Sequence, residues 1–369
     1  MATSLQTRPS HSLAPKAKGF VELLGRSNFS FLRGASSPEE MVEHAIHNEY
    51  DGLALCDLNG LYGVARGYQT ANSPSIFTAS AKAKEGFRYL IGSELTLTDQ
   101  SYVTLIPKNK QGYTHLCELL TLGKRQAAKG FSSLSLEQIN KYNSDLLCIA
   151  IPPIDDKRYE ALEKVFGDRL YIPVWRDYTW ESHEFYGQAL NLEQKYGAQL
   201  FVTQRPFMHA KERKKVFDVL TCILHHTTLE DAKDKLIQNA ERHLRSLPEI
   251  CSLWADRVDL VEKTVDIAAR VNFSLNEIRY RYPRSNLPEG RTPSEHLRFL
   301  VEEGCKWRFP LGVSPKIEAI IEHELELIKD LEYEDYFLTL REICEFADRR
   351  GILYQGRGLS LIHISEPTR

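Results

Sequence analysis

Several features that would place a protein outside the cell or in a membrane are absent from this sequence. Its seven cysteines are odd in number and none forms a Cys-x-x-Cys pair, which argues against a disulfide framework and indicates a reducing cytosolic compartment. The longest uncharged apolar run, residues 146–154, is far shorter than the roughly 20 residues that a membrane helix needs. Residues 1–18 lack the apolar stretch of a secretory signal and are expected to form a mobile tail. We therefore expect a soluble, cytoplasmic protein.

An excess of charge of one sign is also absent. The chain carries 47 Lys and Arg residues against 50 Asp and Glu residues, a net charge of 47 − 50 = −3. This balance gives no sign of nucleic-acid binding by overall charge, although a local groove can still be basic. With 42% apolar and 10% aromatic residues, the 369-residue chain can bury a sizeable core, and its length allows two or three domains.

What the chain does contain, from residue 20 onward, is an alternation of short apolar runs with helical patterns. Strands are expected at residues 52–56, 89–92, 102–106, 146–151, 170–174 and 200–203, and helices at residues 37–48, 113–122, 159–166 and 182–196. Several of the runs are apolar throughout, which is typical of strands buried on both faces. The alternation predicts an α/β fold built on a parallel sheet or barrel.

After about residue 211 the pattern becomes helical. Ser314 and Pro315 are expected to start an amphipathic helix, and Gly351 is expected to end a second one. Residues 280–292, with two prolines and a glycine, are expected to form a connector near a domain boundary.

Polar side chains stand at the ends of several expected strands, where the chemistry of α/β folds collects. Asp57, Glu94, Gln204 and Arg205 each lie at or just beyond the carboxyl end of such a run. Two carboxylates can ligate a hard cation or form an acid/base pair. They can equally be structural, with Asp57 capping the turn at residues 57–60 and Glu94 paired with an arginine. The residue types alone leave both interpretations open.

Motifs spread along most of the chain carry a family resemblance. They stand at residues 22–36 (ELLGRSNFSFLRGAS), 38–42 (PEEMV), 59–63, 90–94 (LIGSE), 108–119, 218–221, 239–244 (NAERHL) and 321–358, the last containing EHEL, YFLT and QGRG. Together they resemble the N-terminal region of bacterial C-family DNA polymerases, and most closely the error-prone relatives of the DNA polymerase III α subunit. The resemblance covers residues 20–358.

This resemblance implies a PHP (polymerase and histidinol phosphatase) domain at residues 19–273, with a distorted (β/α) barrel, followed at residues 274–358 by the beginning of an α-rich polymerase palm. The implied activity is that of a DNA-directed DNA polymerase, a nucleotidyltransferase of DNA replication and of repair synthesis across DNA damage. Its substrates are a DNA primer-template and deoxynucleoside triphosphates, its cofactor is Mg²⁺, and a sliding clamp and mutagenesis accessory proteins are candidate partners. The family's catalytic aspartates lie beyond residue 358, so no polymerase catalytic residue is expected in this chain.

Active PHP domains hold up to three cations with His, Asp and Glu side chains at strand ends. By position, the resemblance places these residues there: Leu24, Arg26, Arg33, Leu58, Glu94, Tyr102, Arg205 and Phe207. Only Glu94 is a metal ligand by type, and arginines repel cations. We therefore expect a vestigial site that holds no metal, in which Arg26 or Arg205 pairs with Glu94 as a structural substitute.

The sequence Gln-Gly-Arg-Gly at residues 355–358 resembles the palm loop that contacts the incoming nucleotide. Gly356 and Gly358 would let the backbone approach a phosphate closely, and Arg357 would donate hydrogen bonds to its oxygens. Residues 359–369 match nothing in the family and resemble the translation of a sequencing-library adapter. We therefore expect a non-native tail there, with a genuine disordered tail as the alternative.

Three functions follow as hypotheses. The first is the N-terminal part of an error-prone DNA polymerase. The second is a metal-dependent PHP phosphoesterase or a proofreading 3′–5′ exonuclease, against which the lost ligands speak. The third, for the isolated chain, is a non-catalytic scaffold, because the residues of nucleotidyl transfer lie outside it. The sequence favours the first for the parent protein and the third for this chain, which is expected to be inactive alone.

Overall fold

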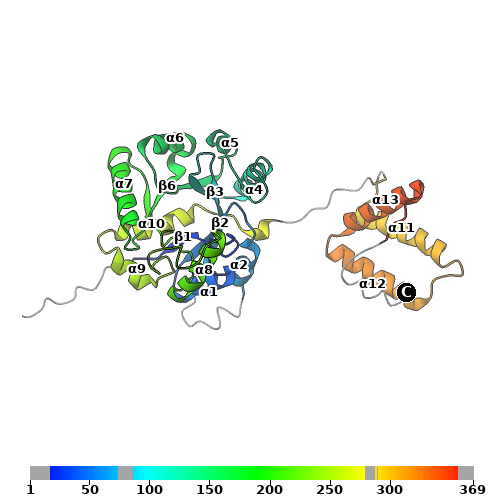
Figure 1. Ribbon diagram of the computed structural model, residues 1–369. Coiled ribbons are helices and arrows are strands. Elements are labelled where there is room, and N and C mark those ends of the chain that lie inside the picture. Colours follow the sequence, from blue (N-terminus) through cyan, green and yellow to red (C-terminus); the bar gives the residue numbers. More distant parts are fainter. Residues whose placement is uncertain (1–16, 74–85, 279–286, 289, 356–369) are drawn as a thin grey trace, which may run out of the picture. The chain divides into compact units, whose positions relative to one another are not determined.

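The computed structural model describes residues 17–73, 86–278, 287–288 and 290–355, which belong to two compact units, residues 1–278 and 279–369 (Figure 1). The first unit is α/β, and the described part of the second consists of helices. Most of the expected N-terminal tail, the nucleotide-contacting Gly356, Arg357 and Gly358, and the expected non-native residues 359–369 lie outside the described residues. Among the helices that are described, none is long and apolar enough to cross a bilayer.

A seven-stranded sheet forms the centre of the first unit. Its strands are β1 (Val21–Gly25), β2 (Gly52–Leu58), β3 (Arg88–Thr96), β4 (Tyr102–Pro107), β5 (Leu146–Ala150), β6 (Leu170–Val174) and β7 (Leu200–Val202), and they lie side by side in chain order. Neighbouring strands are parallel, except that β4 runs antiparallel to both β3 and β5. The expected α/β class is confirmed, and the sheet is mixed rather than parallel because of β4.

The reversal at β4 follows from the short connection that precedes it. Only residues 97–101 join β3 to β4, whereas a crossover between parallel strands needs about a dozen residues or more. The chain therefore turns back as a hairpin, in which the Leu97 amide donates to the Ser101 carbonyl at 2.8 Å. Leu95 and Val103 pair across the hairpin.

Both faces of the sheet are buried, which explains the continuous apolar runs. Along β5, Leu146 and Cys148 belong to one apolar cluster, and Leu147 and Ile149 belong to another. Successive side chains of a strand point to opposite faces, so a strand covered on both faces must be apolar at every position. A helix, α10 (Val258–Ala269), packs against both β1 and β7, the first and last strands of the sheet order.

The other helices of the first unit are α1 (Pro38–His47), α2 (Val64–Ala71), α4 (Lys110–Arg125), α5 (Leu136–Lys141), α6 (Asp156–Phe166), α7 (Trp180–Tyr196), α8 (Lys214–Leu224) and α9 (Leu247–Leu253). Local capping signals fix their ends. The Ser37 side chain accepts from the Glu40 amide, and the Glu40 side chain accepts from the Ser37 amide, in a capping box before α1. Gly197 ends α7 with φ of 70°, a left-handed conformation that glycine adopts at little cost.

Strand β1 is the one strand that the apolar pattern does not predict. Glu22 interrupts its apolar residues, yet the structure buries all five residues of the strand, Glu22 included. A charged residue inside a buried strand needs its own partners, and these lie at the functional edge of the sheet described below.

The described part of the second unit contains α11 (Pro293–Arg308), α12 (Pro315–Asp330) and α13 (Glu334–Arg350). Helix α11 packs against α13. The expected helix ends are confirmed: Ser314 is the N-cap of α12, and Gly351 ends α13 in the left-handed conformation with φ of 63°.

Candidate functional site

Two arginines pair with one buried carboxylate near the carboxyl ends of the parallel strands. Glu94 lies near the end of β3 and is only 5% exposed. Arg26, which directly follows β1, donates from Nη2 to Glu94 Oε1 at 2.5 Å. Arg205, shortly after β7, places its Nη2 3.6 Å from Glu94 Oε2. The structure therefore brings together three residues that are far apart in the sequence.

The charges of this cluster are unevenly matched. Burial opposes ionisation of Glu94, but Arg26, Arg205 and the more distant Arg33 hold the pKa of its carboxyl below the usual value. Burial lowers the pKa of Arg205 to about 10; Glu94 acts against this shift, whereas Arg242 and Arg26 add to it by repulsion. One carboxylate thus balances a group of neighbouring cations only in part.

A further buried arginine, Arg242, belongs to the same site. Its Nε donates to Asp177 Oδ2 at 2.6 Å, and the residue is 8% exposed. Its guanidinium lies 4.7 Å from the centre of the Trp175 ring, and the guanidinium of Arg205 lies 5.2 Å from the centre of the same ring. Such stacking on an aromatic face stabilises a desolvated guanidinium. Sequence reasoning assigned no role to Arg242 or Trp175, although Arg242 stands in the family motif at residues 239–244.

Asp57 has a structural task in the described residues. Its buried carboxylate accepts from the Ser27 amide at 2.9 Å, from the Ser27 hydroxyl at 2.7 Å and from the Ser30 hydroxyl at 2.7 Å. We expected Asp57, if structural, to cap the turn at residues 57–60. This is wrong, because the donors to its carboxylate are Ser27 and Ser30. Asp57 instead fixes the loop that follows β1 and carries Arg26.

The remaining positions of the expected vestigial site differ in their surroundings. Leu24 is a core residue, packed in the same apolar cluster as Tyr102, and Leu58 is half-buried. The guanidinium of Arg26 lies 5.3 Å from the centre of the Phe207 ring. Arg33 acts on Glu94 through its charge alone. The structure thus joins Arg26, Glu94, Arg205 and Phe207 directly.

Among these positions, Glu94 is the one that carries a carboxylate or imidazole, and arginines surround it. Both oxygens of Glu94 face guanidinium groups, which repel a metal ion. The nearby His209 is engaged elsewhere, with its Nδ1 2.8 Å from the Ser36 hydroxyl. Within the part of the chain that the structure describes, no group of three or more His, Cys, Asp and Glu side chains is arranged to hold a metal ion.

Glu22, the charged residue inside β1, connects the two end strands of the sheet. Its carboxyl accepts from the Thr203 hydroxyl at 2.5 Å and from the Gln204 amide at 2.7 Å. Full burial raises its pKa to about 7, although these hydrogen bonds act in the opposite direction. The Thr203 hydroxyl also accepts from the Arg205 amide at 2.8 Å, so Glu22 helps to position Arg205. An acid within an apolar run was the available sequence signal for this role.

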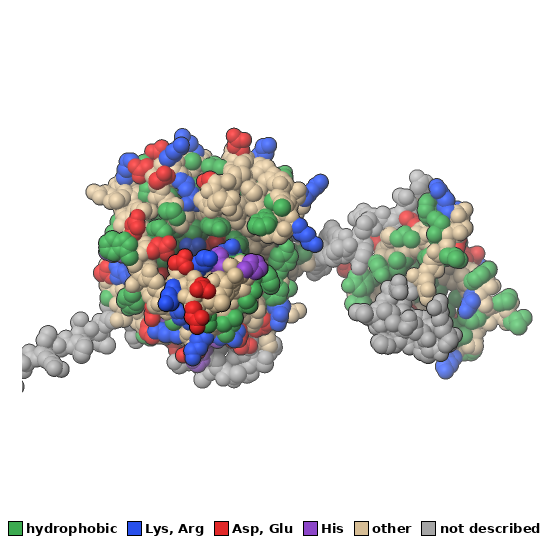
Figure 2. Space-filling model, in the orientation of Figure 1, with side chains coloured by type: hydrophobic (Ala, Val, Ile, Leu, Met, Phe, Trp, Pro, Cys, Tyr) green, Lys and Arg blue, Asp and Glu red, His purple; other side chains and the backbone are tan. Residues whose placement is uncertain are grey.

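Positive and negative side chains are intermingled on the face of the first unit that Figure 2 shows. That face is hollowed, and Lys or Arg side chains are visible inside the hollow. The mixture agrees with the small net charge of the chain. It means that any strong electrostatic preference on this face is local.

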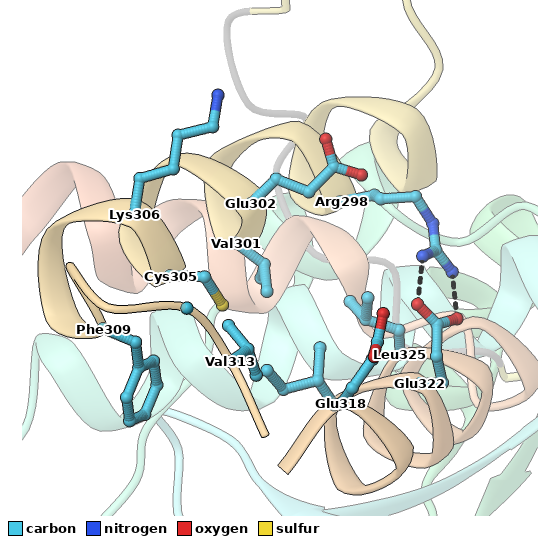
Figure 3. A pocket seen from close by; sticks show the side chains of 12 residues that line it. Arg298, Val301, Glu302, Cys305, Lys306, Phe309, Val313, Glu318, Glu322 and Leu325 are labelled. Atoms are coloured by element: carbon cyan, nitrogen blue, oxygen red, sulfur yellow. Dashed lines mark hydrogen bonds and ion pairs between the residues drawn. The ribbon is translucent and has the colours of Figure 1, made fainter. Parts of the chain in front are cut away.

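The second unit has a cavity of its own, about 380 Å³ in volume, between α11 and α12 (Figure 3). Apolar side chains, among them Val301, Phe309 and Leu325, line much of it. Arg298 donates from Nη1 and Nη2 to the two carboxylate oxygens of Glu322 at 2.5 and 2.8 Å, which ties the two helices together.

Residues 23–175, from β1 to the end of β6, match the PHP domain family. This match covers β1 to β6 of the mixed sheet, so this part of the first unit is similar to PHP domains. Residues 295–360 match a second family, the bacterial DNA polymerase III alpha NTPase domain. The two matches occur in the order that the sequence motifs predict.

Error-prone DNA polymerases are similar to nearly the whole chain. The one from Bdellovibrio bacteriovorus is 72% identical over 93% of this chain and 32% of its own length. Those from Hahella chejuensis and Rhodopirellula baltica are 36% and 33% identical, over 92% and 93% of this chain and 32% and 30% of their own lengths. This chain therefore matches the N-terminal PHP and NTPase region of the C-family error-prone DNA polymerases, and it spans about a third of the length of these relatives.

A more distant similarity links the chain to a solved structure, PsfC from Pseudomonas syringae. The two are 14% identical, with a TM-score of 0.35 over 51% of this chain and 77% of that one. A similarity this low carries no argument about function.

Proposed function

We propose that this chain works as the N-terminal region of an error-prone DNA-directed DNA polymerase, and that its PHP unit is a scaffold without a bound metal. The proposal of a scaffold without metal rests on the pairing of Arg26 and Arg205 with Glu94. The identity of 72% to an error-prone polymerase supports the first part.

In this proposal, guanidinium groups perform the structural task that cations perform in an active PHP site. Arg26 and Arg205 join the ends of β1, β3 and β7 through one carboxylate, and Asp57 anchors the loop that carries Arg26. A buried charge network with few exposed atoms holds loops rigidly, because breaking any one pair leaves a buried charge unpaired. A rigid PHP unit can support the rest of a polymerase without chemistry of its own.

The longer parent protein would carry out the polymerase reaction itself. Mg²⁺ would stabilise the triphosphate charge and the attacking 3′-hydroxyl there, held by aspartates outside this sequence. The proposed substrates are a DNA primer-template and deoxynucleoside triphosphates. Gly356, Arg357 and Gly358 would contact the incoming nucleotide, and residues 274–358 would form the start of the palm. A sliding clamp and mutagenesis accessory proteins are proposed partners in the cytoplasm, where the seven free cysteines would stay reduced.

The alternative of a metal-dependent phosphoesterase or 3′–5′ exonuclease has little support from the side chains. Such a reaction needs several neutral imidazoles and carboxylates around the cations. Of the positions that the family uses, only Glu94 offers a ligand, and both of its oxygens face arginines.

Two experiments test the proposal. In the first, residues 20–358 replace the matching region of the Bdellovibrio polymerase, and primer extension is measured. The chimera is expected to extend a primer, whereas this chain alone is not. A folded chimera without activity would contradict the polymerase assignment.

In the second experiment, the purified chain is incubated with zinc or manganese, dialysed, and analysed for metal content. The expected content is far below one ion per chain. Glu94→Gln is the matched control, because any trace metal that persists in it is not held at Glu94. A stoichiometric ion that Glu94→Gln loses would overturn the scaffold proposal.

A further inference from the structure

A cavity of about 470 Å³ opens beside the Glu94 cluster in the first unit. Its walls include Tyr102 from the start of β4, Trp175 just after β6, and Arg205 and Phe207 after β7. Arg242 also lines it. The cavity therefore lies at strand ends of the sheet, and arginines and aromatic rings form much of its surface.

Buried hydrogen-bond donors without a partner gather in the residues of this cavity. Nε of Arg205, Nη1 of Arg242 and Nε1 of Trp175 are buried, and none has a hydrogen-bond partner among the described residues. Trp175 is 3% exposed and Arg242 is 8% exposed. All three atoms are N–H donors, and a buried donor left unpaired costs about 1–3 kcal/mol. Donors of one kind around one cavity indicate that it is suited to an acceptor.

The charged groups around the cavity also favour an anion. Among the acids, Glu94 is engaged by two arginines, Asp177 pairs with Arg242, and Asp99 accepts from the Ser101 hydroxyl. Asp99 and Glu181 are the exposed acids that line the cavity. Burial, and after it repulsion from neighbouring arginines, lowers the pKa values of Arg205 and Arg242. The cation Arg158 uses Nη1 and Nη2 on backbone carbonyls, and its Nε is also unpaired.

We propose that this cavity binds a phosphate group directly, through Arg205, Arg242 and Trp175 and without a metal ion. A phosphate presents oxygens in several directions, and guanidinium groups match them with paired donors. The cavity volume of about 470 Å³ also allows a ring attached to the phosphate. The site would thus bind an anion, whereas the site of an active PHP domain binds cations.

The source of the phosphate is either the free ion or a phosphate ester of a nucleotide or a strand end. Exposed Tyr178 and Trp180, 74% and 77% exposed, lie in the segment that leads to Glu181 at the rim. An exposed ring can stack on a nucleobase. The inference concerns the first unit alone and does not depend on the polymerase assignment.

The test is calorimetric titration of the full chain, kept in EDTA, with inorganic phosphate, a deoxynucleoside 5′-monophosphate, the matching nucleoside, and an oligonucleotide with and without a 5′-phosphate. We expect one phosphate group to bind per chain, with no loss of affinity caused by EDTA. Tighter binding of the monophosphate or the phosphorylated strand than of inorganic phosphate identifies an ester as the source, and the reverse identifies the free ion.

Arg242→Gln is expected to weaken phosphate binding at least tenfold. Its matched control is Arg66→Gln, because Arg66 also lies against a ring, that of Phe29, and also pairs with a carboxylate, that of Glu39, but outside the cavity. If Arg242→Gln does not fold, Trp175→Phe keeps the ring and removes only the Nε1 donor, and it should weaken binding severalfold.

Four results would overturn the inference. One is the absence of binding of every phosphate compound. Another is equal binding of the nucleoside and its monophosphate, and the third is unchanged phosphate binding in both Arg242→Gln and Trp175→Phe. The fourth is phosphate binding that appears only after zinc or manganese is added. If the metal analysis finds an ion at Glu94 but phosphate still binds in EDTA, only the scaffold proposal is contradicted.

Discussion

Arg26 and Glu94 form a buried ion pair, 2.5 Å from Nη2 to Oε1, between the loop after β1 and the end of β3. The two side chains are 11% and 6% exposed, so water screens the pair little. Arg205 shares the same carboxylate from the far end of the sheet order. The carboxylate therefore connects strands that are distant in the sequence and stabilises the edge where the candidate site lies.

Replacement of Glu94 by Gln is expected to lower the free energy of unfolding by about 3–5 kcal/mol. The change leaves Arg26 and Arg205 buried without their counterion, which is the costly way to break a buried pair. Urea unfolding measures the loss. The control is Glu39→Gln, which removes the partner of the exposed Arg66 and should cost less than about 1 kcal/mol.

The double variant Arg26→Met/Glu94→Met tests the same relationship from the other side. Removing both charges should be less destabilising than removing Glu94 alone, because it leaves one buried arginine of the cluster, Arg205, without its counterion instead of two. Additive effects of the two single changes would show that the pair is not coupled.

Glu22 gives the first unit a specific pH dependence. Its pKa is about 7 in the folded chain, raised from an ordinary value of 4.5, so the folded state keeps a proton that the unfolded state releases between these values. Its contribution therefore lowers the free energy of unfolding as the pH rises from about 4.5 to 7, by about 3 kcal/mol in all.

Glu22→Gln should remove most of this dependence, because the amide does not titrate. The measurement is the free energy of unfolding at pH 5 and at pH 7.5 for both proteins. Between pH 5 and pH 7.5, the free energy of unfolding is expected to fall more in the wild type than in the variant. Equal changes in the two proteins would contradict the raised pKa of Glu22.

Asp57→Asn is expected to release the loop at residues 26–36. Three hydrogen bonds from Ser27 and Ser30 converge on the carboxylate, and a weakened acceptor costs about 1–3 kcal/mol. Amide hydrogen exchange should become faster in this loop than elsewhere. Asp256→Asn, at an exposed ion pair with Arg176, is the control and should leave exchange in the loop unchanged.

Two helical glycines should respond to alanine in opposite directions. A Cβ on Gly112 would lie 2.1 Å from the Asp145 carbonyl oxygen, a backbone atom that cannot move away cheaply, so Gly112→Ala should cost about 1–3 kcal/mol. Gly187 in α7 faces open space, and Gly187→Ala should stabilise the protein by about 0.5–1 kcal/mol through helix propensity. Thermal unfolding of both variants checks the pair, and a destabilised Gly187→Ala would be contrary to expectation.

The local features of this protein follow from its sequence alone. The capping Ser37, the helix-ending Gly197 and Gly351, and the apolar run of β5 act through backbone preference and side-chain periodicity, which depend on near neighbours. The short connection of the β3–β4 hairpin also stands in the sequence, although the apolar pattern indicates a parallel sheet there. The family motifs likewise gave the correct relatives, because they are strings of adjacent residues.

The family resemblance led to the expectation that Arg26 or Arg205 pairs with Glu94, and the tertiary structure decided that both arginines meet this carboxylate. Arg26, Glu94 and Arg205 come from three separate strand ends, and the curled sheet brings those ends together. Arg242 and Trp175, to which no pattern assigned a role, join them, and Glu22 became a buried connection between β1 and the residues after β7. Coulombic and hydrogen-bond energies depend on distance and burial in space, and spacing along the chain fixes neither for residues of different strands.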